Sequence, residues 1–180
     1  MKLERGASAP FFEAEDSHEH TWRFPDDFKD KKLVLVFLRH LGCPLCKRRI
    51  DELKKDYLRF KESGAELMVI VDSTRPRVEK YADGKSIPYP LVWDKEKRIY
   101  SAYGVERGGL KAFLAPRVLK ASLSATLKGY LHGPILGSEL QKPAEFIIDK
   151  SGKVVWAHYG EDISDSTPNE TLLRELSVAK

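Results

Sequence analysis

The sequence predicts an α/β domain in which a central mixed sheet is flanked by helices. Residues 32–72 contain two short runs of branched apolar residues separated by a longer segment with helical periodicity. This is the order of a strand–helix–strand unit with parallel strands. Residues 144–160 contain two further strand-like runs around the turn sequence DKSG, which predicts an antiparallel hairpin. Parallel and antiparallel pairs in one sheet make it mixed.

The two apolar runs of the first region have the pattern of strands buried on both faces. The runs at 32–38 (KLVLVFL) and 65–72 (AELMVIVD) are unbroken and rich in branched residues. Between them, Pro44 suits the first turn of a helix, and Ser63 and Gly64 suit its end. We expect one amphipathic helix of about five turns there, whose apolar residues recur at Ile50, Leu53, Tyr57 and Leu58.

The remaining segments continue the alternation of helices and strands. Residues 74–84 predict a short helix, 87–94 an edge strand interrupted by prolines, and 97–105 another short helix. The closing helix is expected to begin at Pro168, with Thr167 as its N-cap.

Residues 106–138 do not fit this alternation, and we interpret them as an inserted helical element within one domain spanning 1–180. Four leucines repeat every fourth residue after Pro116, which favours a helix: Leu119, Leu123, Leu127 and Leu131. Between Glu106 and Glu139 the chain has five basic residues and no acidic one. We expect solvated lysines over an apolar stripe packed on the body. A homodimer, a membrane surface or an anionic substrate contacting this element is a secondary hypothesis.

Composition excludes several classes of function. The 31 basic residues are nearly matched by 27 acidic ones, and a net charge of +4 is small for a nucleic-acid-binding protein. No apolar run approaches the roughly 20 residues of a membrane span. The start, MKLERGASAPFF, lacks the apolar core of a secretory signal. We therefore expect a cytoplasmic protein without nucleic-acid partners.

Both cysteines of the chain, Cys43 and Cys46, lie where the first buried strand gives way to its helix. A Cys-x-x-Cys pair at a helix start can close a small disulfide loop, and the helix N-terminus favours the thiolate. Five nearby basic residues add positive potential: Arg39, His40, Lys47, Arg48 and Arg49. We predict a dithiol redox site with at least one reactive thiolate at neutral pH.

Two non-redox interpretations remain open. The cysteines could be small buried apolar residues, or half of a zinc site. A zinc site needs two more ligands at compact spacing, whereas the histidines are scattered along the chain, at His18, His20, His40, His132 and His158. No metal and no tightly bound cofactor are expected.

Several stretches resemble the thioredoxin superfamily, and specifically its peroxiredoxin-like branch. GCPLC after an apolar strand and the later KPAEFIIDKSGKVVW are similar to that superfamily. GASAPFF and WRFPDDFKDKKLVLVFLRH resemble the opening of the branch, where a short hairpin precedes the first long strand. RHLGCPLCKRRIDEL and residues 116–149 resemble the AhpC/TSA-like proteins related to the prostamide/prostaglandin F synthases. The resemblance implies a thioredoxin-like fold and a redox site at Cys43 and Cys46.

The resemblance leaves the attacking cysteine open. Cys43 matches the exposed first cysteine of a thioredoxin site, whereas Cys46 falls at the peroxidatic cysteine of ordinary peroxiredoxins. Exposure at the helix start makes Cys43 our first expectation. Pro143 falls where thioredoxin-like proteins carry a cis-proline, although a strand-leading proline is the plain alternative. Pro44 and Pro143 are thus supporting residues of the predicted site.

The chain also departs from the peroxiredoxin pattern. A proline seven residues and a threonine or serine three residues ahead of the reactive cysteine are replaced by Arg39 and Cys43, and the arginine expected near Pro143 is absent. Arg39 could clamp an anion or oxygen atom in its place, and His40 could donate a proton to the leaving group.

We expect a thiol-dependent enzyme that reduces peroxides, or related O–O or S–S substrates, through a reversible Cys43–Cys46 disulfide. An external thiol such as thioredoxin or glutathione would reset it. A general thiol-disulfide oxidoreductase and a non-catalytic binding module with inert cysteines are the alternatives.

Overall fold

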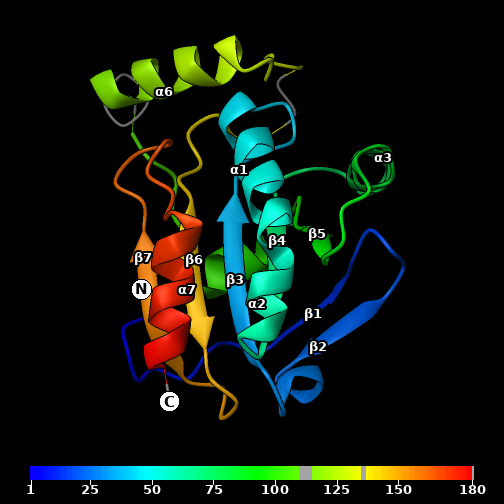
Figure 1. Cartoon of the computed structure of the whole chain (residues 1–180), viewed down its shortest axis with the longest axis vertical. Helices are drawn as coiled ribbons and strands as arrows, with labels where there is room; N and C mark the ends of the chain where they lie inside the picture. The colour runs from blue at the N-terminus through cyan, green and yellow to red at the C-terminus, as the bar shows by residue number, and fades with distance from the viewer. Residues whose placement is uncertain (110–114, 135–136, 180) are drawn as a thin grey trace.

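The centre of the molecule is a five-stranded mixed sheet. The computed structural model describes residues 1–109, 115–134 and 137–179. The strand order is β5-β4-β3-β6-β7 (Figure 1), with β3 at Lys32–Leu38, β4 at Ala65–Val71, β5 at Leu91–Trp93, β6 at Ala144–Ile148 and β7 at Val154–Tyr159. β3 pairs parallel with β4 and antiparallel with β6, and β6 and β7 form the antiparallel hairpin. The predicted mixed sheet is therefore confirmed.

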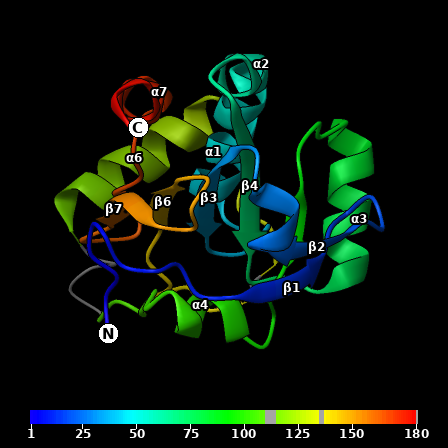
Figure 2. The ribbon, with the colours of Figure 1, turned by 90° about the horizontal axis from the view of Figure 1, so that it is seen from below.

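Helices lie on both faces of this sheet. They are α1 at Pro44–Lys55, α2 at Tyr57–Glu62, α3 at Arg75–Lys85, α4 at Arg98–Ala102, α6 at Pro116–Leu127 and α7 at Asn169–Val178. Side chains of α1, α2, α3 and α7 form one apolar core with Val34, Val36 and Leu38 of the central strand. The opposite face packs against α4 and an N-terminal hairpin (Figure 2).

That hairpin consists of β1 at Phe12–Glu15 and β2 at Thr21–Phe24, followed by a 3-10 turn, η1, at Asp26–Phe28. Phe12, Phe24 and Phe28 are buried against the sheet. The short hairpin that the resemblance implied before the first long strand is present.

The long helix expected after Pro44 is broken in two. Asp56 interrupts it with φ −103° and ψ 10°, between α1 and α2. Ile50 and Leu53 are fully buried as expected, but Leu58 is 71% exposed. The break turns the chain so that Phe60, rather than Leu58, reaches the core.

The closing helix begins one residue later than expected, at Asn169, and no side chain caps it. Thr167 is therefore not the N-cap. Its hydroxyl instead donates to the Glu145 carboxylate, at 3.1 Å. The Thr167 hydroxyl is bonded to Glu145 of strand β6, and so it does not cap the start of α7.

The segment predicted to be an inserted helical element contains a helix, α6, but the packing predicted for its leucines is wrong. Val118 and Ala125 are buried against the body, whereas the repeated leucines are largely exposed. Their exposure ranges from 60% to 80% for Leu119, Leu123, Leu127 and Leu131. α6 lies across the N-terminal end of α1 (Figure 1). Lys111, counted among the basic residues of this segment, falls outside the described residues.

No helix within residues 1–109, 115–134 and 137–179 is long and apolar enough to cross a membrane.

Candidate active site

The strand-to-helix junction brings the sulfur of Cys43 onto the N-terminus of α1. Cys43 is the N-cap residue, with extended backbone angles of φ −77° and ψ 126°. Its Sγ accepts a hydrogen bond from the backbone N–H of Cys46, at 3.4 Å. A sulfur thus occupies the position that a serine or aspartate oxygen takes in an ordinary N-cap. Pro44, at the first helical position, has no N–H to satisfy.

Arg39 is the cation that touches this sulfur. Its Nη2 donates to Cys43 Sγ at 2.7 Å. Its Nη1 donates to the backbone oxygen of Glu139 at 2.5 Å and to the Glu139 carboxylate at 3.0 Å. Arg39 is only 4% exposed, so solvent screens these interactions little.

These contacts give the two thiols different pKa values. Burial opposes ionisation of Cys43, but a hydrogen bond from the Cys46 thiol and the charge of Arg39 outweigh it and lower its pKa to about 6. Burial, reinforced by the neighbouring Cys43 sulfur, raises the pKa of Cys46 well above its usual value. These surroundings therefore favour the thiolate at Cys43 and the protonated thiol at Cys46.

The expectation that Cys43 is exposed is wrong. Cys43 has no exposed surface and Cys46 is 5% exposed. Burial alone would fit the interpretation of inert apolar cysteines. The guanidinium on Cys43 and the lowered pKa of that thiol do not fit it, because an inert buried thiol needs no cation.

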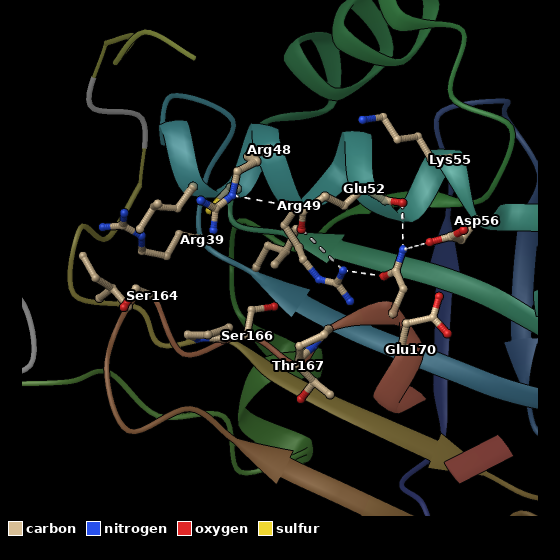
Figure 3. A pocket seen from close by; sticks show the side chains of 17 residues that line it. Arg39, Arg48, Arg49, Glu52, Lys55, Asp56, Ser164, Ser166, Thr167 and Glu170 are labelled. Carbon is tan, nitrogen blue, oxygen red and sulfur yellow. Dashed lines mark hydrogen bonds and ion pairs between the residues drawn. The ribbon is translucent and has the colours of Figure 1, made fainter. Parts of the chain in front are cut away.

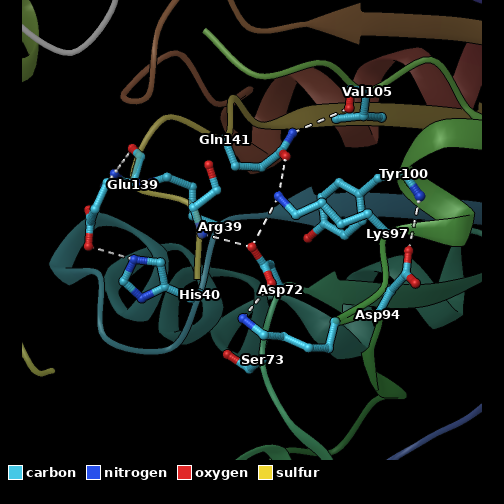
Figure 4. A network of polar contacts seen from close by, with 12 residues as sticks. Arg39, His40, Asp72, Ser73, Asp94, Lys97, Tyr100, Val105, Glu139 and Gln141 are labelled. Carbon is cyan, nitrogen blue, oxygen red and sulfur yellow. Dashed lines mark hydrogen bonds and ion pairs between the residues drawn. The ribbon is translucent and has the colours of Figure 1, made fainter. Parts of the chain in front are cut away.

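His40 belongs to the support of Arg39 rather than to the sulfur (Figure 4). It is fully buried, its Nδ1 accepts from the N–H of Gly42 at 3.1 Å, and its Nε2 lies 2.8 Å from Glu139 Oε1. The proton is therefore on Nε2, and burial lowers the pKa of His40. A neutral ring with both nitrogens engaged is a poor proton donor, so His40 positions Glu139.

Asp72, after strand β4, fixes the segment that carries Glu139. Its carboxylate accepts from the backbone N–H of Ser138 at 2.9 Å and pairs with Lys97 at 3.0 Å. Its own N–H donates to the carbonyl of Arg39 at 2.9 Å. Asp72, at the end of β4, thus fixes the position of Arg39, after the parallel strand β3, relative to the segment of Glu139 (Figure 4).

The other basic residues predicted around the thiols turn away from Cys43. Lys47 Nζ donates to the carbonyl of Leu131 at 3.0 Å. Arg48 pairs with Glu52 at 3.4 Å. Arg49 is buried and donates to Asn169 Oδ1 at 2.5 Å.

Pro143 does not have the cis bond that its position suggested. Among the described residues the cis peptide bond is Phe24–Pro25, so the bond before Pro143 is trans. Pro143 instead leads strand β6, and its carbonyl accepts from Gly160 at 2.9 Å. It lines a cavity together with Cys46.

Gly42 lets another segment close over the site. The N–H of Gly133 donates to the carbonyl of Gly42 at 2.9 Å. A Cβ on Gly42 would collide with the backbone oxygen of Pro134 and would approach His40 Nδ1 to 2.9 Å. The chain after α6 is thus seated directly on the loop before Cys43.

Two cavities flank the dithiol. One, of about 390 Å³, lies between α6 and the first turn of α1 and is lined by Arg39, Pro44, Leu119 and Glu139 among others. The other, of about 400 Å³, lies between α1 and the start of α7 and includes Cys46 (Figure 3). Arg39 and Ile163 line both cavities.

Within the described ranges, no cluster of three or more histidine, cysteine, aspartate or glutamate side chains could hold a metal ion. The zinc interpretation of Cys43 and Cys46 thus lacks partners in that part of the chain.

Known proteins share this architecture. Peroxidoxin BcpB from Mycobacterium tuberculosis superposes with a TM-score of 0.73 at 21% identity, over 99% of each chain. A PrxQ variant from Xylella fastidiosa also gives 0.73, at 14% identity, over 98% of this chain and 96% of that one. The molecule thus has the thioredoxin-like fold of these proteins.

The family is shown by sequence. Residues 5–157 match the model of the AhpC/TSA family, and the chain belongs to that family. It is 23% identical to peroxiredoxin-like 2C of Bos taurus over 165 residues, 86% of this chain and 72% of that protein. It is 26% identical to the prostamide/prostaglandin F synthase of Salmo salar over 157 residues, 84% of this chain and 78% of that protein. Membership supports a thiol-dependent redox function.

Glu139 is the site residue that sequence reasoning missed. In the sequence Glu139 marks only the acidic end of a basic stretch, 96 positions after Cys43. A signal was present, since a lone acidic residue following that stretch is a natural partner for a buried arginine such as Arg39.

Proposed function

We propose that this protein reduces a peroxide, or a related O–O or S–S substrate, through a reversible Cys43–Cys46 disulfide. The observation that carries the proposal is the 2.7 Å contact between Arg39 Nη2 and Cys43 Sγ, which stabilises a thiolate one helical turn from a thiol. This geometry supports Cys43 as the attacking cysteine. The peroxiredoxin register had favoured Cys46, whose raised pKa argues against that role.

The reaction begins with attack of the Cys43 thiolate on one peroxide oxygen. With a hydroperoxide attacked at its O–H oxygen, the O–O bond breaks, the leaving alkoxide or hydroxide takes a proton from water, and Cys43 becomes a sulfenic acid. With an endoperoxide the sulfur instead forms an S–O ester of the opened peroxide, which Cys46 can cleave in the same way. Arg39, already hydrogen-bonded to the sulfur, also faces the cavity beneath α6, where it can donate to the peroxide oxygens.

Cys46 then resolves the sulfenic acid. Its sulfur attacks Cys43 Sγ, the S–O bond breaks, and the hydroxide leaves as water with the Cys46 proton. Two equivalents of an external thiol reduce the resulting disulfide. With an S–S substrate, the same thiolate attacks sulfur and Cys46 resolves a mixed disulfide.

The approach of substrate requires a local movement. Cys43 has no exposed surface, and the cavity beneath α6 reaches its neighbours Arg39 and Pro44 rather than its sulfur. A side chain of that cavity must shift before attack. The apolar side chains of α6 that line it, Val118 and Leu119, suit a substrate with an apolar body.

The test is a panel of hydrogen peroxide, an alkyl hydroperoxide, a lipid endoperoxide and a small disulfide, each mixed with the fully reduced protein. We expect a mass loss of two hydrogens within the chain and turnover when a thiol reductant is added. A folded protein that keeps both thiols after exposure to every oxidant, a disulfide included, would show a non-catalytic module. Oxidation by disulfides alone would favour the general thiol-disulfide oxidoreductase.

A further inference from the structure

The cavity between α1 and the start of α7 reaches Cys46 and not Cys43. One wall is α1, with Cys46, Arg49 and Glu52, and the other is the segment before and at the start of α7, with Ser166 and Asn169 (Figure 3). Its volume of about 400 Å³ is within the range of small-molecule sites. In the proposed reaction the oxidising substrate does not occupy this cavity.

Arg49 lies in this cavity with donors left over. It is 4% exposed, and Nη1 donates to Asn169 Oδ1, but Nε and Nη2 have no hydrogen-bond partner among the described residues. Arg39 lines the same cavity, and its Nε also has no hydrogen-bond partner among the described residues. Leaving buried donors of a charged group unsatisfied is costly. These atoms therefore point to a ligand with acceptor oxygens.

The acidic groups nearby have partners but do not bond to the free donors of Arg49. Glu52 pairs with Arg48 at 3.4 Å and, at 3.8 Å, with Nη1 of Arg49. Glu170 binds Arg59 through both carboxylate oxygens. Asp56 accepts from Asn169 Nδ2 at 2.7 Å.

Behind the wall, Glu145 accepts from the Ser166 hydroxyl at 2.7 Å and from Thr167. Burial lowers the pKa of Arg49, and the charges of Glu145 and Glu52 oppose that effect. Arg49 thus stays charged, and the carboxylates around it leave its Nε and Nη2 unbonded.

We propose that this cavity binds the carboxylate of a small thiol, which reduces the enzyme by attacking Cys46. The inference rests on the disulfide cycle proposed above. The anion would bond to the free Nε and Nη2 of Arg49, in a cavity that Arg48 and Arg39 also line. The thiol of the bound molecule then lies toward Cys46. The oxidising substrate is assigned to the other cavity, on the Cys43 side of Arg39.

The chemistry favours this direction of attack. The reductant thiolate bonds to Cys46 Sγ, the Cys43–Cys46 bond breaks, and Cys43 leaves as a thiolate stabilised by Arg39. A thiol of lower pKa is the better leaving group. A second reductant thiolate attacks the sulfur of the bound reductant, which releases a reductant disulfide and a Cys46 thiolate that takes a proton from water. Two thiols are oxidised and one protein disulfide is reduced.

The experiment starts from protein whose internal disulfide has been verified by mass. The rate of its reduction is measured with glutathione, which carries carboxylates, and with 2-mercaptoethanol, which carries none. Each rate is corrected for the pKa of the reductant thiol. Dithiothreitol shows that the disulfide is reducible. We expect saturation with glutathione and a linear dependence on 2-mercaptoethanol. S-methylglutathione, which has the carboxylates without the thiol, should compete with glutathione.

Two variants locate the anion site. In Arg49→Gln we expect the ratio of the glutathione rate constant to the 2-mercaptoethanol rate constant to fall about tenfold, which corresponds to about 1.4 kcal/mol. Because Arg49 is buried and its variant could misfold, Arg48→Gln at the rim provides a second test, with a smaller fall. Arg174→Gln removes the same charge from an exposed site on α7 outside the cavity and should leave the ratio unchanged.

The outcomes separate the two proposals. If no oxidant produces the disulfide, the proposed function fails. If the disulfide forms and dithiothreitol reduces it, but the ratio is the same in wild type, Arg48→Gln and Arg49→Gln, the carboxylate site is refuted. Competition of S-methylglutathione with the peroxide instead of the thiol would also refute it, by assigning the cavity to the oxidant.

Discussion

Cys43 and Cys46 are separated by one turn of the same helix, yet they lie in opposite environments. Cys43 receives the N–H of Cys46 and a guanidinium, and its pKa falls to about 6. Cys46 lies inside the turn, where burial raises its pKa. The spacing of a dithiol therefore does not define its chemistry. What matters is which sulfur occupies the N-cap and which one the buried cation reaches.

Exchanging each sulfur for oxygen should have the largest effect. Cys43→Ser should lose turnover with every oxidant by roughly a thousandfold or more, because the proposed nucleophile is removed. Cys46→Ser should still react once, and its sulfenic acid should be trapped by dimedone and detected by mass. Trapping in Cys43→Ser instead of Cys46→Ser would reverse the assignment.

Removing the cation should make the two cysteines more alike. In Arg39→Gln the Cys43 pKa should rise from about 6 to at least the 8.5 of a free thiol, so that the thiolate fraction at pH 7 falls roughly 30-fold. The alkylation rate with iodoacetamide, measured in a Cys46→Ser background, reports this fraction. Arg39→Lys is the matched control and should recover part of the rate, since it keeps the charge but loses the two-pronged contact. An unchanged rate in Arg39→Gln would show that Arg39 does not set the pKa.

The pH dependence should differ between the sulfurs. The reactive thiolate is the form above the pKa, so alkylation of Cys43 should rise about tenfold from pH 5 to pH 7, with its midpoint near 6. Cys46, measured in Cys43→Ser, should stay unreactive over this range because its pKa is raised by burial. A midpoint above pH 8 for Cys43 would contradict the environment described for it.

The segment that covers the Cys43 side should be sensitive to one methyl group. Gly42→Ala should lower the free energy of unfolding by about 1–3 kcal/mol, because its Cβ collides with the backbone at Pro134. Gly84→Ala is the control, since a Cβ there meets nothing within 4 Å and lies in α3. It should be neutral or stabilising. Urea unfolding measures both, and equal values would show that the contact at Gly42 is loose.

The smallest effect is expected above the same site, on α6. Leu123→Ala should change the free energy of unfolding by less than about 0.5 kcal/mol because Leu123 is 60% exposed. Leu53→Ala, in the core of α1, should cost about 2–5 kcal/mol. A large cost at Leu123 in urea unfolding would mean that the leucine face is covered in solution.

The leucine repeats show what sequence periodicity can predict and what it cannot. The spacing of Leu119, Leu123 and Leu127 correctly predicted a helix, because the repeat reflects local backbone geometry. It did not predict which face would be buried. Val118 and Ala125 face the body instead, since small residues allow α6 to lie close to α1.

For Arg39 and His40, the sequence likewise predicted the position of the residues but not their contacts. Their position after a buried strand predicted that they would lie beside the helix start, and both do. Their roles could not be read from neighbouring residues. Arg39 bonds the sulfur while His40 faces Glu139, and the difference depends on a residue about 100 positions away.

The sequence by itself determined the order of strands and helices, the mixed sheet and the place of the dithiol at the start of α1, because these follow from apolar periodicity and short-range backbone preferences. Tertiary structure alone decided that Cys43 is buried beside a cation that lowers its pKa, that the bond before Pro143 is trans, and that Glu139 and Asn169 bind the arginines Arg39 and Arg49. Burial and charge pairing arise from segments that meet only after the chain has folded, so no local pattern encodes them.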